Sequence, residues 1–307
     1  MARKFDILGL GVAVVDELLL VRKFPLPNEK FPVLSWERQS GGLTATALVA
    51  ASRLGCDCHL PIPLGADDLS GFIRNALTRE GITLHERPGK PGERPYNAIV
   101  ITEKGSGDRT IIWSEEGLFS LELGPADLEL VDQAGCVFVD NGYADNVVGA
   151  ARRARDRGIP VVGDFESTAP NVVELINLTD HAIMPLAHAS SLTGESDPVK
   201  IVAAMMRTPG RTLACVTDSE RGSWHAERGD PERVLHQPAF QVETIVDTCG
   251  CGDVFHGAYA ACLVRGFPPA ERIRRASAAA ALKAGKAGSQ LGAPTLAELE
   301  AFLKGRG

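Results

Sequence analysis

Residues 246–257 read Val-Asp-Thr-Cys-Gly-Cys-Gly-Asp-Val-Phe-His-Gly and carry the strongest signal in the sequence. A Gly-Cys-Gly run directly before a helix leaves successive backbone N–H groups free at the positive end of the helix dipole, where anions such as phosphate bind. An aspartate there would repel a phosphate, so we interpret Asp253 as having a task, such as taking a proton from an attacking hydroxyl. The structural alternative is a glycine turn before a helix, in which Asp253 only caps free amides.

Short β-rich runs alternate with helical segments along the rest of the chain. Strands are predicted at residues 5–11, 135–139, 161–164 and 212–216, and helices at 42–55, 145–157, 199–207 and from 295 onward. Asp197-Pro198 and the capping box that begins at Thr295 mark two of the helix starts. Short buried strands separated by helices predict an α/β fold, in which a mainly parallel sheet is covered by helices on both faces. Such a sheet binds ligands at the carboxyl ends of its strands.

Two segments, 17–38 and 93–115, interrupt this alternation and favour extended β structure. The second is predicted to be a hairpin around the turn at 104–108. We expect these segments to form a small β-sheet lid inserted in a single domain of residues 1–307, because the sequence has no internal repeat, low-complexity tract or linker that would divide the chain.

Composition excludes several classes of protein. The chain has 307 residues, 44% hydrophobic and 23% charged, and a formal net charge of −7, so nucleic acid is not an expected partner. No apolar stretch approaches the roughly 18 residues of a membrane span, and we expect a cytoplasmic protein without a membrane partner. The seven cysteines lack the spacing of zinc or redox motifs and are interpreted as reduced thiols.

The stretch 247–253 strongly resembles the carboxyl-terminal signature D-T-x-G-A-G-D of the ribokinase family, also called the PfkB carbohydrate kinases. Cys251 in place of alanine is the one departure. Further matches follow in the expected order over essentially the full length: Gly11-x-x-x-x-Asp16, Gly41-Gly42 before a helix, Gly65-x-Asp67-x-x-Gly71, and residues 216–222. The resemblance implies a ribokinase-like fold and an ATP-dependent kinase that phosphorylates a hydroxyl of a small sugar.

The resemblance also implies roles for individual residues. Asp253 would be the general base, and the amides of Gly250, Cys251 and Gly252 would form an anion hole for the transferred phosphoryl group. Asp16, Gly41, Gly42 and Thr46 would bind the sugar, Thr46 standing where many members carry an asparagine. The nucleotide-binding residues would be Thr217, Ser219, Gly222, Thr248, Gly250 and Gly252. Ser219 replaces a glycine that is usual in this turn.

Two cations are implied. Magnesium would accompany ATP, but the N-x-x-E element of the family aligns with residues 185–188 and lacks its carboxylate. Magnesium is therefore expected on the nucleotide phosphates and water, with Asp164 or Glu166 as further ligands. Asp247, with the carbonyl of Cys249, resembles half of a monovalent-cation site for potassium; an ordinary Asx cap is the alternative.

Local similarities suggest the type of sugar. Residues 180–182 and 236–240 are similar to bacterial sulfofructose kinases, and Trp36-Glu37-Arg38 is similar to ketohexokinases. A ketohexose-like substrate is expected. On the sulfofructose analogy Lys30 in the lid would face an anionic group of the sugar, whereas a solvated surface charge is the alternative.

Other functions stay open at this point. A nucleoside kinase shares every motif above, and a sugar-sensing pseudokinase is suggested by the lost N-x-x-E carboxylate and by Cys251. A nicotinamide-dependent oxidoreductase is disfavoured because Gly9-x-Gly11 lacks the third glycine of a dinucleotide fingerprint. The resemblance further implies a homodimer formed through the lid.

Overall fold

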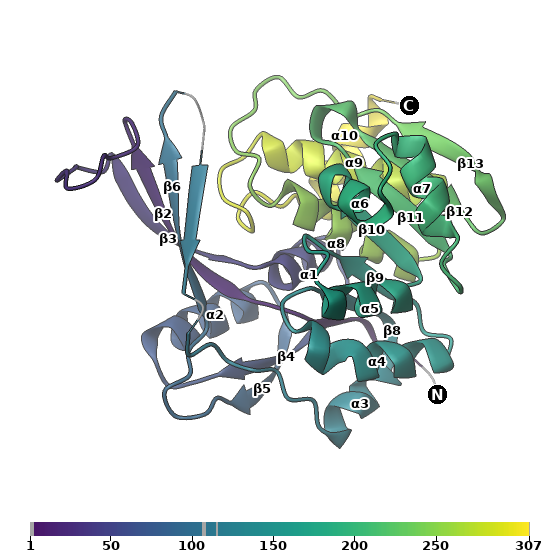
Figure 1. Cartoon of the computed structure of the whole chain (residues 1–307), viewed down its shortest axis with the longest axis horizontal. Helices are drawn as coiled ribbons and strands as arrows, with labels where there is room; N and C mark the ends of the chain where they lie inside the picture. Colours follow the sequence, from purple (N-terminus) through teal and green to yellow (C-terminus); the bar gives the residue numbers. More distant parts are fainter. Residues whose placement is uncertain (1–2, 106–108, 115, 307) are drawn as a thin grey trace.

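The computed structural model describes residues 3–105, 109–114 and 116–306. A nine-stranded sheet with helices on both faces forms the larger part of the molecule, and a separate four-stranded sheet stands beside it (Figure 1). This arrangement confirms the predicted fold class. Among the described residues, no helix combines the length and the apolar character that crossing a membrane requires.

The large sheet is parallel over most of its width. Its strands, in spatial order, are β13 (Asp230–Gln237), β12 (Ser223–Glu227), β11 (Leu213–Thr217), β10 (His181–Pro185), β9 (Val161–Asp164), β8 (Ala134–Asp140), β1 (Phe5–Leu10), β4 (Cys58–Leu64) and β5 (Thr83–Pro88). Every neighbouring pair from β11 to β5 is parallel, whereas β12 and β13 add an antiparallel hairpin at one edge. The carboxyl ends of the parallel strands therefore meet at one side of the sheet.

Each face of this sheet has its own hydrophobic core. Side chains alternate along a strand, so that in β8 Cys136 and Phe138 enter one core while Val137 and Val139 enter the other. The first core is covered by α1 (Leu43–Arg53), α2 (Asp68–Arg79), α8 (Cys251–Val264), α9 (Pro269–Ala284) and α10 (Leu296–Lys304). The second is covered by α3 (Pro125–Val131), α4 (Ala144–Asp156), α5 (Pro170–Leu178), α6 (Leu186–Thr193) and α7 (Pro198–Met206).

The helix starts predicted from capping residues are confirmed. The Asp197 side chain accepts a hydrogen bond from the Lys200 amide at 3.0 Å, with Pro198 as the first residue of α7. Thr295 and Glu298 form the reciprocal capping box of α10. These bonds satisfy amides that have no partner within the helix.

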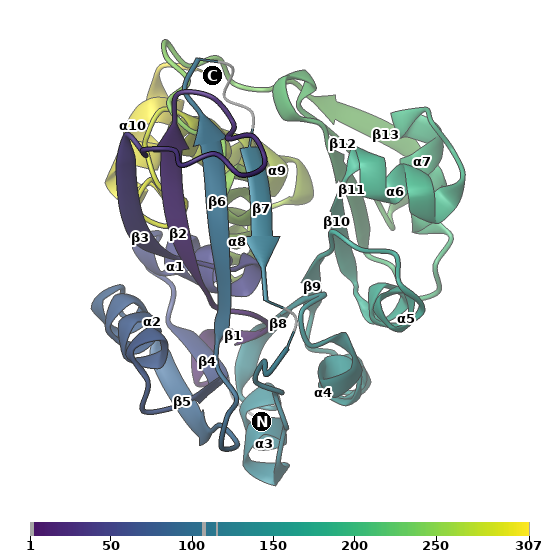
Figure 2. The same cartoon turned by 60° about the vertical axis from the view of Figure 1, so that its left-hand side comes forward.

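The small sheet has the strand order β3-β2-β6-β7 (Figure 2). Its strands are β2 (Val14–Val21), β3 (Ser35–Gly41), β6 (Tyr96–Glu103) and β7 (Arg109–Trp113). They come from the two predicted lid segments, and β2 and β3 reach three residues beyond the first of them at either end. β6 and β7 form the predicted hairpin, but residues 106–108 of its predicted turn lie outside the described residues.

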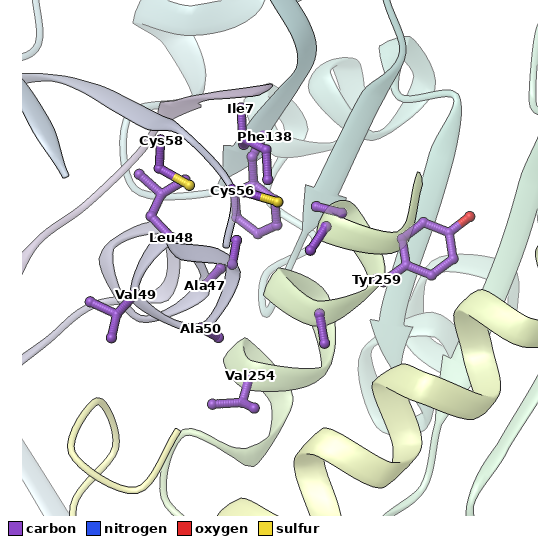
Figure 3. Packing of buried hydrophobic residues seen from close by; sticks show 14 of the residues in the cluster. Ile7, Ala47, Leu48, Val49, Ala50, Cys56, Cys58, Phe138, Val254 and Tyr259 are labelled. Carbon is purple, nitrogen blue, oxygen red and sulfur yellow. The ribbon is translucent and has the colours of Figure 1, made fainter. Parts of the chain in front are cut away.

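α8 packs against α1, with Val254 of α8 and Ala47 of α1 in the same hydrophobic cluster (Figure 3). Gly257 allows the two helices to approach this closely. A Cβ atom at position 257 would lie 2.1 Å from the Ala47 carbonyl oxygen, which is backbone and cannot rotate away. We expect Gly257→Ala to lower the free energy of unfolding by about 1–3 kcal/mol, as overpacked cores typically do. Urea unfolding measures this change.

Gly149→Ala in α4 is the matched control, because a Cβ atom there meets no atom within 4 Å. Alanine is favoured over glycine in a helix interior by roughly 0.5–1 kcal/mol, so this variant should be at least as stable as the wild type. Equal stability of Gly257→Ala and the wild type would contradict the close contact between α1 and α8.

Candidate active site

The loop before α8 turns sharply at Gly250. Gly250 has φ = +80°, and a Cβ atom there would lie 2.6 Å from Ser289 Cβ and 2.9 Å from its Cα. Glycine is thus required both by conformation and by space. The helix then begins at Cys251 and carries Asp253 in its first turn. This is the arrangement of glycine turn and helix start that the sequence predicts.

The amides of this turn are only partly free. The Cys251 amide, which the sequence analysis placed in an anion hole, donates to the Thr248 carbonyl at 3.3 Å. The amides of Gly250 and Gly252 have no hydrogen-bond partner within residues 3–105, 109–114 and 116–306. Of the three amides that were predicted to form the anion hole, these two are therefore available to an anion in this conformation.

Asp253 lies among other acidic groups. Burial raises the pKa of its carboxyl well above the usual value, and the nearby charges of Asp164, Glu166, Asp140 and Asp16 raise this pKa further. A carboxylate of raised pKa is a stronger base than an exposed one, which suits the deprotonation of a hydroxyl.

His256 connects the first turn of α8 to the large sheet. Its Nδ1 lies 2.7 Å from the Gly252 carbonyl oxygen and 3.2 Å from Asp164 Oδ2, and its Nε2 lies 3.1 Å from the Ile183 carbonyl oxygen. Burial lowers the pKa of His256, while the two carbonyl oxygens act in the opposite direction. The ring thereby fixes the backbone that precedes Asp253.

Asp140, at the end of β8, is a central residue that the sequence analysis did not identify. Its buried carboxylate accepts hydrogen bonds from the amides of Val12 at 2.9 Å, Thr44 at 3.1 Å and Gly142 at 2.7 Å, and from the Thr44 hydroxyl at 2.8 Å. These bonds hold the β1–β2 connection and the start of α1 at the carboxyl end of the sheet. An aspartate directly after a buried strand was the available signal.

The predicted sugar-binding residues Asp16, Gly41 and Gly42 are brought together where the small sheet meets α1. A Cβ atom at Gly41 would lie 2.1 Å from Asp16 Oδ2, so the glycine makes room for the carboxylate. Gly42 has φ = +97°, and its missing Cβ would lie 2.6 Å from the Val12 carbonyl oxygen. Burial raises the pKa of Asp16 to about 6.

Thr46 lies one turn into α1 and is buried. Gln290, from the segment after α9, lies 3.5 Å from the Thr46 hydroxyl and 3.4 Å from the Gly41 carbonyl oxygen through its Nε2. Gln290 is therefore a further polar group beside the predicted sugar residues, and no motif in the sequence indicated it.

The predicted nucleotide residues follow β11. Thr217 ends this strand, and Ser219 has φ = +45°, a left-handed conformation that explains why glycine is usual at this position. Gly222 has φ = +90°, and a Cβ atom there would lie 2.1 Å from the Gln237 carbonyl oxygen. Thr248 is exposed before the Gly250 turn. The turn at 217–222 thus lies at the same carboxyl edge of the sheet as the start of α8.

Lys30 is not brought to these residues. It lies exposed in the connection between β2 and β3. Asp16 pairs with Gln39 near the opposite end of this hairpin. At about 3.3 Å per residue, the length of the hairpin separates Lys30 from Asp16 in this conformation.

The Asp247 oxygens that were expected to bind a monovalent cation contact a lysine instead. Lys283 Nζ lies 2.7 Å from the Asp247 carbonyl oxygen and 3.3 Å from Asp247 Oδ2. The Cys249 amide donates to Asp247 Oδ1 at 2.8 Å, which is the Asx-type bond of the structural alternative. The Asp247 half of the predicted cation site is therefore occupied by the Lys283 ammonium group and does not fit a separate potassium ion, while the Cys249 carbonyl, the other predicted ligand, accepts no backbone hydrogen bond among the described residues.

Arg109 of β7 is a second cation that the sequence analysis missed. Burial raises the pKa of the Cys249 thiol to about 11, and the charge of Arg109 acts against this increase. Arg109 is paired with Thr102 in the small sheet, and their row lies on the same face as Asp16. The small sheet thus directs a positive charge toward the loop before α8.

A base beside an anion-binding helix start, at the carboxyl edge of a parallel sheet, suits phosphoryl transfer to a hydroxyl. The fold and this geometry define a phosphotransferase with an alcohol group as acceptor. The sequence model of the pfkB family carbohydrate kinases matches residues 7–296, and the chain belongs to this family.

Relatives and solved structures agree with this assignment. The ribokinase of Haemophilus influenzae is 27% identical over 302 residues, covering 96% of this chain and 97% of its own, and the ketohexokinase of Mus musculus is 23% identical, covering 92% and 97%. A putative ribokinase from Agrobacterium tumefaciens has 28% identity and a TM-score of 0.85, with 98% of each chain covered.

Two further structures hold ligands. Arabidopsis thaliana ribokinase, complexed with ribose and ATP, has 24% identity and a TM-score of 0.87, covering 98% of this chain and 99% of its own. A putative ribokinase II from E. coli, in complex with ATP and Mg²⁺, has 20% identity and a TM-score of 0.83, covering 99% and 100%. These two likenesses support the fold.

Proposed function

We propose that this carbohydrate kinase transfers the γ-phosphoryl group of ATP to a hydroxyl of a small, ketohexose-like sugar, with Asp253 as general base. The observation that carries the proposal is the position of Asp253 in the first turn of α8, next to the free amides of Gly250 and Gly252 and near Asp16. The ribose and ATP of the Arabidopsis thaliana structure and the similarity to mouse ketohexokinase support a sugar acceptor.

In this proposal the sugar lies between the small sheet and α1. The Asp16 carboxylate accepts hydrogen bonds from sugar hydroxyls, and the two glycines at 41 and 42 let the backbone approach the ring. Asp253 takes the proton of the attacked hydroxyl, and the free amides of Gly250 and Gly252 stabilise charge on the phosphoryl group. Closure of the small sheet excludes water that would otherwise compete as acceptor.

Residues for magnesium are available near Asp253. Asp164 Oδ2 is buried and accepts no hydrogen bond within the described ranges 3–105, 109–114 and 116–306, although His256 Nδ1 lies 3.2 Å away. An oxygen without a hydrogen-bond donor fits a cation that arrives with the nucleotide. Over the same ranges, no cluster of three or more His, Cys, Asp or Glu side chains forms a metal site. Asp164 and Glu166 would therefore be additional ligands of a magnesium ion that is held mainly by ATP. When bound, this ion would neutralise negative charge on the ATP phosphates.

The test is ADP release from ATP and magnesium across free ketoses, aldohexoses, pentoses, sulfosugars, phosphosugars and nucleosides. Rapid turnover of one ketohexose or a close analogue supports the proposal. Turnover of nucleosides over free sugars would favour the nucleoside kinase. Sugar-dependent thermal stabilisation without ADP release would favour the pseudokinase.

We also propose that two chains associate through the small sheet. Adjacent strands place Trp36, Ile99 and Ile112 on the face opposite Asp16. The exposed fraction of the surface is 65% for Trp36, 40% for Ile99 and 53% for Ile112. Such a cluster of apolar side chains on one face is typical of an interaction surface. Light scattering should give the mass of two chains for the wild type and of one chain for Ile112→Glu. A single-chain mass for the wild type would contradict the proposal.

A further inference from the structure

Lys283 lies in the last turn of α9 and is fully buried, with 0% of its surface exposed. Its side chain passes over Gly292, where a Cβ atom would lie 2.8 Å from Lys283 Cδ and 3.2 Å from its Cε. Lysine is rarely buried to this extent unless its charge is paired. Both the space and the charge of this side chain therefore need an explanation.

The ammonium group of Lys283 makes two hydrogen bonds and one ion pair with oxygen atoms. It donates to the Asp247 carbonyl at 2.7 Å and to the Lys286 carbonyl at 3.3 Å, and it pairs with the Asp247 carboxylate at 3.3 Å. An ammonium group has three donors and no acceptor. Two of the donors are therefore used in hydrogen bonds to backbone carbonyls, and the charge is paired with the Asp247 carboxylate.

The same contacts join residues 247–249, which precede the Gly250 turn, to residues 283–288 at the end of α9 and after it. The Asp247 carboxylate accepts from the Cys249 amide at 2.8 Å and from the Gly288 amide at 2.9 Å. The Ser289 side chain then fills the space beside Gly250. Removing the Lys283 charge would leave Asp247 unpaired at the centre of this arrangement.

We propose that Lys283 is a positioning residue that takes the place of a bound monovalent cation, so that the enzyme works without potassium. The charge of Lys283 holds Asp247 in place, and Asp247 in turn holds the loop before α8. In the proposed function, the amides of Gly250 and Gly252 in this loop bind the phosphoryl group. The inference rests on the proposed function for its effect on turnover. The contacts themselves belong to the free protein, so ATP binding and thermal stability report on it independently.

The first experiment needs no variant. ATP affinity, thermal midpoint and sugar turnover of the wild type are measured in potassium, sodium and choline salts at equal ionic strength. We expect differences of less than twofold in affinity and turnover, and an unchanged midpoint. A tenfold or greater stimulation by potassium over sodium would overturn the inference, and a selective rise of the thermal midpoint in potassium would do the same.

The second experiment uses Lys283→Ala, which opens the space of the ammonium group, and Lys283→Met, which keeps most of the stem without the charge. We expect each variant to bind ATP at least tenfold more weakly than the wild type. Potassium or methylammonium should increase the ATP affinity of Lys283→Ala at least threefold and should raise its thermal midpoint. Lys304→Met, which removes another last-turn lysine from an exposed position on α10, should bind ATP within twofold of the wild type.

A folded Lys283→Ala with wild-type ATP affinity would overturn the inference, as would a weakened variant that neither cation improves. Should both Lys283 variants fail to fold, the potassium series on the wild type decides the question. Should no sugar be phosphorylated, the proposed function fails, while ATP affinity and the thermal midpoint still test the role of Lys283.

Discussion

Asp253→Asn lowers kcat for sugar phosphorylation by at least about 100-fold, which is the lower range of what a general base contributes. The amide has nearly the shape of the carboxylate but cannot take a proton. ATP binding should stay within a few-fold of the wild type, because the Gly250 turn and the start of α8 are held by the conformation of Gly250 and by the contacts of Asp247 and Lys283, and not by the Asp253 side chain. Steady-state rates and calorimetric titration with ATP measure the two quantities.

Asp145→Asn is the matched control, since Asp145 also lies in the first turn of a helix, α4, but on the exposed surface. It should retain turnover within twofold. Near-normal turnover by Asp253→Asn would remove Asp253 from the role of base.

Asp16→Asn raises KM for the sugar by roughly 10- to 100-fold, because hydrogen bonds to a charged group contribute about 1.5–3 kcal/mol. The effect should depend on pH. Burial raises the pKa of Asp16 to about 6, so the carboxylate is ionised above this pH and protonated below it. The wild-type kcat/KM for the sugar should therefore fall as the pH decreases through about 6. In Asp16→Asn this contribution is lost, and only the decrease that comes from protonation of the base Asp253 should remain.

The measurement is kcat/KM for the sugar between about pH 5 and 8. Glu17→Gln is the control, because Glu17 is the next residue of β2 and bonds Trp36 and Arg38 on the opposite face of the small sheet. It should keep the wild-type KM and the pH step. An unchanged KM in Asp16→Asn would exclude Asp16 from the sugar site.

The parallel sheet and its helices were predictable because their segments are periodic and apolar, and because Asp197 and Thr295 mark helix starts by local bonds. β4, β5, β10, β12 and β13 were not predicted. Much of β5 and β13 is exposed, with polar and charged residues throughout. Strands at the edges of a sheet bury less surface, so their sequences need not show the alternation that identifies a buried strand.

The site was predictable where its residues belong to one local motif, as at 247–253. Its supporting residues were not, because their contacts join distant parts of the chain. The Asp140 carboxylate holds the Val12 amide across 128 positions, and Gln290 approaches Gly41 across 249. Lys283 was missed for the same reason: a lysine at a helix end is usually solvated, and only the packing over Gly292 shows that this one is buried.

The most direct test is to incubate the purified protein with ATP, magnesium and the sugar that gives the fastest ADP release, and to analyse the sugar by mass spectrometry. We expect a phosphorylated sugar that forms in equal amount to ADP with the wild type and at no more than about one hundredth of that rate with Asp253→Asn. ADP without a phosphorylated sugar, or equal product from both proteins, would contradict phosphoryl transfer to a sugar with Asp253 as its base.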